Sequence, residues 1–585
     1  MVFRSPEWVP KLPFDPPDSI PICDFVLREQ YGRVPLNQSR APYTCGLTGK
    51  EYSTAEVTQR VDFLARALAR RLGWEPNRGS EWDKVIGVFS LNSIDTLSLA
   101  WAIHRLSGIC SPTNAAYPRS ELTYQLKASK AKALFTCVPL LPIALAAAHD
   151  VGIPQDRIYI LELPEEFETG NDNQNNYETV NQLIDFGRGL PELEPLQWTK
   201  GQGANQTAFL CLSSGTSGLP KMAMISHRNV IANIMQIASF ERPYRDKMSR
   251  SSNRPYYTEV ALGLLPQSHI YALVIICHAS TYRGDNVIVL PKFDLLQMLR
   301  SVEKYRINIL YIVPPIILTL TKSEKVTKRF DLSSVRAVYT GAAPLGTGAA
   351  EDLQKQFSHW KIRQTYGMTE ASPLVLCTNY TDIWLGSSGS LLPSTEARIV
   401  SDEGHDIEQY DQPGELFVRS PSVVLGYLNN DQANLETFQG GWLRTGDEAM
   451  VRVSPQGTEH LWIVDRLKEL IKVKGHQVAP AELEDHLLSH PSVLDAAVIP
   501  VPDPESGEVP KAFIVKQPSA GVVVPNSVIK REILKHVANH KAQYKWLKGG
   551  VEFVEEIPKS PSGKILRRLL RDRERASRRQ NSSKL

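Results

Sequence analysis

Short apolar runs alternate with helical patterns along most of the chain, and this alternation limits the fold more than any other feature. The runs are "KVIGVFS", "ALFTC", "RIYIL", "TAFLCL", "NVIVL", "NILYIV" and "AVYTGA". Strands that alternate with helices build sheets whose faces the helices cover. The sequence therefore predicts an α/β fold.

The pattern changes to a finer scale near the C-terminus, which predicts a second domain. From about Pro480, a helix "PAELEDHLL", a strand "VLDAAVIPV" and a helix "SVIKREILKHVANH" capped by Ser527 follow one another closely. The 585 residues exceed the size at which a single core stops growing. We expect a large N-terminal domain of several subdomains at 1–465 and a small α+β domain at 466–585.

Composition argues against several kinds of partner and site. A net charge of +3 indicates neither nucleic acid nor an anionic membrane as partner. The seven cysteines are far apart and form no CxxC pair, so neither a disulfide framework nor a zinc site is predicted. Residues 260–282 lack Asp, Glu, Lys and Arg, but Pro266, Gln267, His269 and His278 would be costly in lipid. We expect a buried strand, turn and helix there, and no transmembrane segment.

The last three residues match a targeting signal. Ser583, Lys584 and Leu585 form the "SKL" tripeptide that the peroxisomal import receptor reads at a free C-terminus. The match predicts this receptor as a partner and the peroxisome as the location, with the cytoplasm otherwise.

The stretch "SSGTSGLPK", Ser213 to Lys221, predicts a phosphate-binding loop. Glycines let backbone N–H groups converge on an anion, while hydroxyls and a lysine add further donors. A Gly/Ser surface turn is the alternative for a lone match. The loop is not a Walker A motif, because Met222 follows the lysine in place of Ser or Thr.

Three later motifs add the remaining parts of a nucleotide site. "YTGAAPLG", 339–346, ends a strand in small residues against which a flat ring could lie. In "QTYGMTEASP", Tyr366 could stack on a base, Thr369 could bond a phosphate and Glu370 could hold magnesium. In "GWLRTGD", Asp447 could accept the ribose hydroxyls. Together, in this order, they indicate a nucleoside triphosphate site.

This set of motifs resembles the AMP-forming acyl-CoA synthetases, and most closely 4-coumarate–CoA ligases and their fungal relatives. "LPQSHIYAL", "GELFVRSPSVVLGYLNN", "VDRLKELIKVKGHQVAPAELE" and "PKSPSGKILRR" also match, and the resemblance runs from about Pro42 to Arg568. It implies a ligase that uses ATP, Mg²⁺ and coenzyme A. The carboxylate would attack the α-phosphate to give acyl-AMP and pyrophosphate, and the CoA thiol would then displace AMP.

The resemblance also implies roles for individual residues. Thr369 would bond the α-phosphate, Glu370 would hold magnesium, and Lys564 would be the adenylation lysine. The residues implied for ATP and AMP are Ser213, Ser214, Gly215, Thr216, Ser217, Gly218, Lys221, Gly341, Ala342, Ala343, Gln364, Tyr366, Gly367, Thr369, Asp447, Arg466 and Lys564.

For the second step, the family rotates its small C-terminal domain about a hinge, here at Asp465 and Lys468. Lys564 would leave the site and the loop "KVKGHQV" would enter. In that loop, Lys472 and Gln477 match positions implicated in catalysis. Gly475, Lys474 and His476 would lie along the CoA.

The acyl pocket implied by the family contains Ser268, His269, Tyr271, Val313, Gly341 and Pro373. Three positions depart from the family pattern: Met222 should crowd the exit of the phosphate loop, Ser268 should enlarge or polarise the pocket, and His476 replaces an aromatic residue. We expect an aryl acid, such as a cinnamate or arylalkanoate, or a medium-chain acid, in secondary metabolism.

Three other functions remain open from the sequence. An acyl-AMP ligase could load a carrier protein, although no carrier domain or thiolation motif is evident. A luciferase-like oxygenase would share the fold and the C-terminal tripeptide. A non-catalytic nucleotide-binding protein is disfavoured because Thr369, Glu370, Asp447 and Lys564 are all present.

Overall fold

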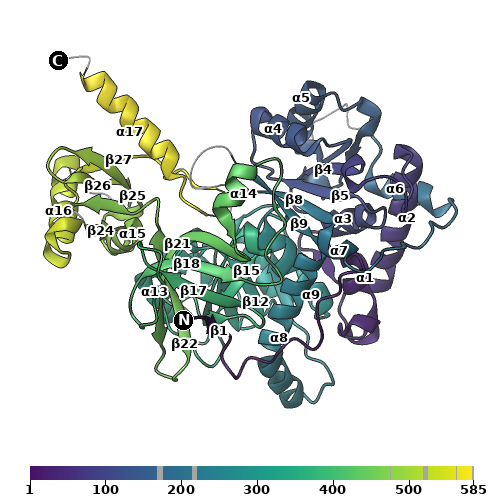
Figure 1. Cartoon of the computed structure of the whole chain (residues 1–585), viewed down its shortest axis with the longest axis horizontal. Coiled ribbons are helices and arrows are strands. Elements are labelled where there is room, and N and C mark those ends of the chain that lie inside the picture. The colour runs from purple at the N-terminus through teal and green to yellow at the C-terminus, as the bar shows by residue number, and fades with distance from the viewer. Residues whose placement is uncertain (168–175, 214–219, 475, 518–524, 561–562, 583–585) are drawn as a thin grey trace.

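The structure is a computed structural model of the whole chain, and it describes residues 1–167, 176–213, 220–474, 476–517, 525–560 and 563–582. Four sheets make up the fold (Figure 1). Each apolar run singled out above is a strand, so the predicted α/β alternation is confirmed.

The first sheet has seven strands in the order β19-β9-β8-β5-β4-β6-β7. Its central strands are parallel, whereas β8, β9 and β19 pair antiparallel. The strands are β4 (Val85–Phe89), β5 (Ile109–Thr113), β6 (Ala133–Thr136), β7 (Ile158–Ile160), β8 (Thr207–Ser213), β9 (Lys221–Ser226) and β19 (Gly426–Tyr427). The helices of this part are α1 (Ile22–Leu27), α2 (Thr54–Leu72), α3 (Thr96–His104), α4 (Arg119–Ser129), α5 (Leu141–Val151), α6 (Val180–Arg188) and α7 (Gln202–Asn205).

The second sheet has nine strands in the order β16-β15-β14-β13-β12-β10-β11-β2-β3. They are β2 (Tyr43–Cys45), β3 (Glu51–Tyr52), β10 (Val260–Gly263), β11 (Asn286–Val289), β12 (Ile309–Ile312), β13 (Ala337–Thr340), β14 (Lys361–Gly367), β15 (Leu374–Cys377) and β16 (Ser390–Leu391). Its helices are α8 (His227–Ser251), α9 (Ala279–Tyr282), α10 (Leu295–Tyr305), α11 (Pro314–Lys322), α12 (Glu324–Thr327) and α13 (Thr347–Gln356). One apolar core joins the two sheets.

The uncharged run 260–282 forms β10, a turn, a π-helix at Tyr271–His278 and α9. The predicted buried strand, turn and helix is confirmed, with the addition that the helix begins in the wider π form, which is frequent at functional sites. None of the helices that the structure describes is long and apolar enough to cross a bilayer. All seven cysteines are buried and free, as expected.

The third sheet is antiparallel, with five strands in the order β1-β17-β18-β21-β20 and β22 added beside β21. The elements are β1 (Phe3–Arg4), β17 (Glu396–Val400), β18 (Gly414–Arg419), α14 (Asp431–Thr437), β20 (Phe438–Gln439), β21 (Trp442–Val453) and β22 (Glu459–Arg466). The fourth sheet, ordered β24-β23-β26-β25 with β27 beside β26, comes from the C-terminal region. The predicted boundary after residue 465 falls one residue before the end of β22, the last strand of the third sheet, and it stays a prediction.

The C-terminal lobe, from Ile471 onward, has its own apolar core. Its elements are β23 (Ile471–Val473), β24 (His476–Val478), α15 (Pro480–Leu488), β25 (Val493–Asp503), β26 (Gly507–Lys516), α16 (Asn526–His540), β27 (Val551–Phe553) and α17 (Arg567–Ser582). In Figure 1 this lobe lies beside the main body and α17 projects away from it. The expected cap at Ser527 is wrong: α16 begins at Asn526 after Pro525, whose backbone is already fixed for a helix start.

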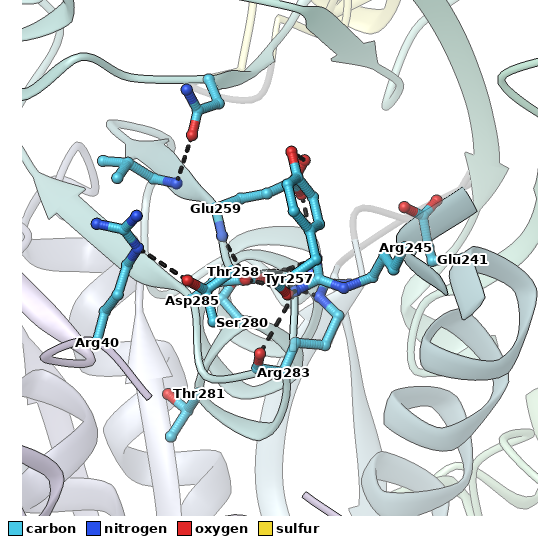
Figure 2. Close-up of polar contacts among 12 residues, drawn as sticks. Arg40, Glu241, Arg245, Tyr257, Thr258, Glu259, Ser280, Thr281, Arg283 and Asp285 are labelled. Atoms are coloured by element: carbon cyan, nitrogen blue, oxygen red, sulfur yellow. Dashed lines mark hydrogen bonds and ion pairs between the residues drawn. The ribbon is translucent and has the colours of Figure 1, made fainter. Parts of the chain in front are cut away.

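A buried network of charges anchors the second sheet to α8 (Figure 2). Arg245 on α8 pairs with Asp285 at 2.7 Å and with Glu259 at 3.2 Å, just before β11 and β10. Arg283 also bonds Asp285, at 3.0 Å. Breaking a buried pair of this kind is costly because it leaves a charge uncompensated. The network thus fixes the amino ends of β10 and β11 to α8, at the edge of the sheet opposite the carboxyl ends of these strands.

Candidate active site

A cavity of about 640 Å³ lies where the parallel strands end and the C-terminal lobe meets the main body. Ligands of open α/β sheets bind at the carboxyl ends of strands, and β13 and β14 end here at Thr340 and Gly367. Of the residues predicted for the site, those that line the cavity are Ser213, Lys221, His269, Tyr271, Ala342, Gly367, Thr369, Glu370, Pro373, Arg466, Lys468, Lys472 and Lys564.

Glu370 connects a group of polar side chains that line the cavity. Its side chain is buried, and Oε1 accepts hydrogen bonds from the Ser213 and Tyr427 hydroxyls, both at 2.6 Å. The ammonium group of Lys221 lies 4.9 Å from the centre of the Tyr427 ring. Burial and the Glu370 charge raise the pKa of Tyr427, so this hydroxyl stays a donor. The loop residues Ser214, Gly215, Thr216, Ser217 and Gly218 lie outside the described residues.

Tyr427 was not among the predicted site residues. It stands in "GELFVRSPSVVLGYLNN", a motif that was matched only as a family signature. Strand β19 brings it beside β9, where Tyr427 pairs with Ala223. Only this long-range strand pairing places its hydroxyl against Glu370, so local sequence offered no signal for the role.

Asp447, Arg466 and Tyr366 form a second polar group. The antiparallel register of β21 and β22 places Asp447 opposite Arg466, with Nε 3.5 Å from Oδ1. The Tyr366 hydroxyl donates to Asp447 Oδ2 at 2.6 Å. Burial raises the pKa of Asp447, while Arg466 and the Tyr366 hydrogen bond oppose that rise. The carboxylate is therefore held in a fixed orientation beside the cavity.

Three residues that were predicted to bind the nucleotide are not among the described residues that line the cavity. Gln364 Oε1 accepts the Gly386 backbone N–H at 2.9 Å, so its side chain supports a loop. A Cβ on Gly341 would lie 2.5 Å from Thr365 Oγ1, which explains the need for glycine there. Ala342, at φ +67°, lines the cavity, whereas Gly341, Ala343 and Gln364 are not among the described residues that line it.

His269 and Tyr271 form the wall at the start of the π-helix. His269 Nδ1 accepts the backbone N–H of Tyr271 at 3.3 Å, so in the neutral ring the proton is on Nε2. Burial, and then the charge of Lys564, lower the pKa of His269 to about 4. The imidazole is therefore neutral near pH 7. Ser268 and Val313 are not among the described lining residues, although Val313 packs close to Gly563.

Lys564 enters this cavity from the C-terminal lobe. The Ser560 backbone N–H donates to the Lys564 carbonyl at 2.8 Å, and the Lys564 N–H donates to Ser560 Oγ at 3.1 Å. Gly563, at φ +81°, lies against Pro315, where a Cβ would come within 3.0 Å. The turn thus needs glycine both for its conformation and for its contact with the main body.

The surroundings of Lys564 alter its charge. Burial, followed by Arg466, lowers the pKa of Lys564 to about 8, and Glu469, Asp447 and Glu370 act in the opposite direction. Lys564 lines the same cavity as Glu370 and Arg466, the partner of Asp447.

The predicted CoA loop lies partly at this cavity. Lys472 on β23 lines it, and its backbone N–H donates to Glu508 at 2.9 Å. Gln477 is paired with Lys472 across the β23–β24 hairpin, but it lines a second cavity instead. His476 stacks on Tyr544 with ring centres 4.3 Å apart, so the imidazole packs here as an aromatic side chain would. Lys474, at φ +48°, donates its N–H to Ser506 at 3.0 Å, and Gly475 lies outside the described residues.

The predicted hinge residues lie between the lobes. Asp465 Oδ2 accepts the backbone N–H of Ala481 at 3.0 Å, which ties the end of β22 to the first turn of α15. Lys468 lines the cavity.

The expected effect of Met222 is wrong: its side chain is buried among Val85, Ile109 and Leu210 on the core side of β9.

Asp485 on α15 makes a contact across the lobes. Burial raises the pKa of this carboxyl, and the nearby backbone N–H of Thr347, the first residue of α13, opposes that rise. Gly346, which precedes that helix, leaves room for it, since a Cβ there would lie 1.6 Å from Asp485 Oδ1. A carboxylate at a helix N-terminus satisfies free N–H groups and interacts favourably with the helix dipole.

Solved structures of other proteins share this architecture. Anthranilate CoA ligase AuaEII, solved with anthranoyl-AMP, superposes with a TM-score of 0.78 at 23% identity, over 95% of this chain and 97% of that one. The ATP-bound MatB of Rhodopseudomonas palustris has a TM-score of 0.76 at 23% identity, over 95% and 98%. At such identity these two structures show the fold alone.

Sequence relatives are closer. The acyl-CoA ligase easD of Emericella nidulans is 43% identical over 572 residues, covering 98% of this chain and all of that protein. The acyl-CoA ligase cm3C of Cordyceps militaris is 40% identical over 592 residues, covering 98% and 90%. Family models match as "AMP-binding enzyme" over residues 34–428 and "AMP-binding enzyme C-terminal domain" over residues 482–564. The family predicted from the motifs is confirmed, and the chain belongs to the AMP-binding enzymes.

Proposed function

We propose that this chain is an AMP-forming carboxylate–CoA ligase whose adenylation site is the cavity that holds Lys564. The observation that carries the assignment of the site is that Lys564, Glu370 and Arg466, which come from distant parts of the chain, line one cavity, with Asp447 paired to Arg466 beside it. The family and the fungal acyl-CoA ligase relatives support the reaction class.

In the first step, a substrate carboxylate oxygen attacks the α-phosphorus of ATP and pyrophosphate leaves with the bonding electrons. Negative charge develops on the phosphoryl oxygens, so fixed donors lower the barrier. Lys564 would bridge the carboxylate and the α-phosphate, and Thr369 would donate to the same phosphate. Asp447, held by Tyr366 and Arg466, would accept the ribose hydroxyls.

Magnesium fits the surroundings of Glu370. The carboxylate is buried and its hydrogen-bond partners are hydroxyl groups, which do not balance its charge. Mg²⁺ binds through one or two carboxylates together with substrate phosphates. When bound, the ion would neutralise charge on the phosphate oxygens. Glu370 would hold it, and Ser213 and Tyr427 would orient Glu370.

In the second step, the CoA thiolate attacks the acyl-AMP carbonyl and AMP leaves. Lys564 then occupies space that the thiol needs, and Lys472 already reaches the cavity rim. We therefore infer that the lobe rotates about Asp465 and Lys468 between the steps. The polar Asp485–Thr347 contact would belong to the first position, since α15 moves with the lobe.

The acyl group would lie against His269, Tyr271 and Pro373. A neutral His269, with its proton on Nε2, can donate to a polar atom of the acid. On the family resemblance, we propose an aryl or arylalkanoic acid, or a medium-chain acid, of secondary metabolism as the substrate. We further propose a peroxisomal location through Ser583–Leu585, which an import assay with and without this tripeptide would test.

The proposed reaction is tested by incubating the protein with ATP, Mg²⁺, CoA and a panel of aryl, arylalkanoic and medium-chain acids. At least one acid should give equal amounts of AMP and acyl-CoA. Formation of acyl-AMP without thioester, unless a carrier protein is added, would contradict the CoA assignment. Light emission that needs oxygen would favour the luciferase-like alternative instead.

The pKa of Lys564 predicts a pH dependence. The ammonium form stabilises the transferring phosphoryl group, and with a pKa of about 8 it is lost as pH rises through that value. The kcat/KM for adenylation should therefore fall above about pH 8, because this parameter reports the free enzyme. In Lys564→Arg, whose guanidinium stays protonated, this alkaline decline should vanish even though the rate is lower. A decline that persists unchanged in Lys564→Arg would assign it to another group.

The two-position account predicts opposite effects at two residues. Asp485→Asn weakens the cap on α13, an interaction of about 0.5–2 kcal/mol, and should slow adenylation more than thioester formation. Lys472→Ala should slow thioester formation from added acyl-AMP more than adenylation. Glu532→Gln, a charge change on exposed α16, serves as the control. Equal losses in both half-reactions for both variants would remove support for rotation.

A further inference from the structure

Four histidines gather on the C-terminal lobe, outside the cavity described above. His486 lies on α15, and His490 follows just after the end of that helix. His536 and His540 lie four residues apart on α16, so they share one helix face. In Figure 1, α16 lies on the side of the lobe away from the main body. None of the four is among the described residues that line either cavity.

The imidazole nitrogens lie near one another. One nitrogen each from His486, His536 and His540 lies within 4.8 Å of the other two. The His486 and His536 rings stack with centres 4.2 Å apart, and His540 lies 5.2 Å from His536. The His490 ring is also 5.2 Å from His536.

Each of the three rings is oriented by a backbone carbonyl. His540 Nδ1 lies 2.8 Å from the His536 oxygen, and His486 Nε2 lies 3.3 Å from the same atom. His536 Nε2 lies 3.2 Å from the His486 oxygen. When one ring nitrogen donates its proton to a carbonyl, the other carries the lone pair. Metal-ligating histidines are held in this way.

Charge also favours neutral rings. Burial, together with the neighbouring His536, His540 and Lys541, lowers the pKa of His486, and a hydrogen bond to His536 acts against this. Burial and His536 lower the pKa of His490, against the opposing charge of Glu532. Lys541 is itself paired with Glu482 at 3.0 Å. Burial therefore disfavours the charged forms of His486 and His490.

We propose that His486, His536 and His540 form a site for one divalent transition-metal ion, of which zinc is the most suitable, joining α15 to α16. Imidazole ligands suit zinc, copper and nickel rather than magnesium or calcium. With Zn–N bonds near 2.0–2.1 Å, ligand nitrogens lie roughly 3.3 Å apart. The rings must therefore close by roughly 1.5 Å from their present limit of 4.8 Å. His540 is exposed, so it can rotate to do so and gives an ion access from solvent.

Three histidines leave a fourth position, which water or His490 would take. The ion would link a helix that contacts the main body, through Asp485, to the outermost helix of the lobe. Because the site is outside the cavity, it neither supplies nor replaces the magnesium proposed beside Glu370. An experiment that disproves the histidine metal site would therefore leave the proposed ligase reaction untouched, and the reverse also holds.

The test uses the full chain without a histidine tag, freed of metal with a chelator and then dialysed. Co²⁺ is titrated while visible absorption is recorded, with Mg²⁺ in excess so that the Glu370 site does not take up cobalt. We expect saturation at one equivalent, displacement of cobalt by one equivalent of Zn²⁺, and a higher unfolding temperature with zinc. Binding that does not saturate near one equivalent would overturn the proposal.

His540→Ala is the decisive variant because the exposed side chain can be removed with little effect on folding. Its cobalt affinity should fall at least tenfold, and zinc should no longer raise its unfolding temperature. His359→Ala removes an exposed histidine elsewhere and should bind like the unaltered protein. Equal affinities in the two variants would overturn the site. If His540→Ala melts lower than His359→Ala without metal, His486→Gln is titrated in its place, and unchanged affinity there would equally overturn it.

Discussion

Arg567 is buried between two carboxylates three positions after Lys564, and the delivery of that lysine depends on this contact. Its guanidinium pairs with Glu469 and Glu484, each at 2.6 Å. Glu469 belongs to the segment that joins the lobes, and Glu484 to α15. Removing one partner from a buried pair costs about 3–5 kcal/mol, because a charge stays behind without compensation. The start of α17, and with it the loop that carries Lys564, is thereby fixed to the lobe as one unit.

The contacts between that unit and the main body are different in kind. Lys322 donates to the Leu494 carbonyl at 2.7 Å, Asp485 lies near the Thr347 N–H, and Gly563 lies against Pro315. Most of these are polar groups that water can replace when the lobes part, so little free energy opposes a rotation. A helix start fixed to its lobe near Lys564, on a lobe held to the main body mostly by polar contacts, is the arrangement that two successive reactions at one cavity require.

The sequence predicts those parts of the fold and of the site that depend on local signals. The parts that depend on contacts between distant segments could not be predicted from it. The buried strands read directly as apolar runs, and the motifs around Glu370 and Asp447 stand at strand ends. The burial of Met222 in the core and the contact of Gln364 with Gly386 were not predicted, since which face of a strand a side chain occupies depends on the register. Tyr427 went unnoticed because only the pairing of β19 with β9 places it beside Glu370. The histidine cluster likewise needs two helices to pack together.

The central claim is that Lys564 acts in the first reaction and must leave for the second. The most direct measurement is single-turnover kinetics of Lys564→Ala in both half-reactions, with the exposed Lys548→Ala as control. The rate of pyrophosphate release that depends on the carboxylic acid substrate should fall by a factor of about 100 or more, as expected when a donor to a developing charge is lost. Thioester formation from added acyl-AMP should stay close to that of the control. Near-normal pyrophosphate release, or an equal loss in both reactions, would contradict the account.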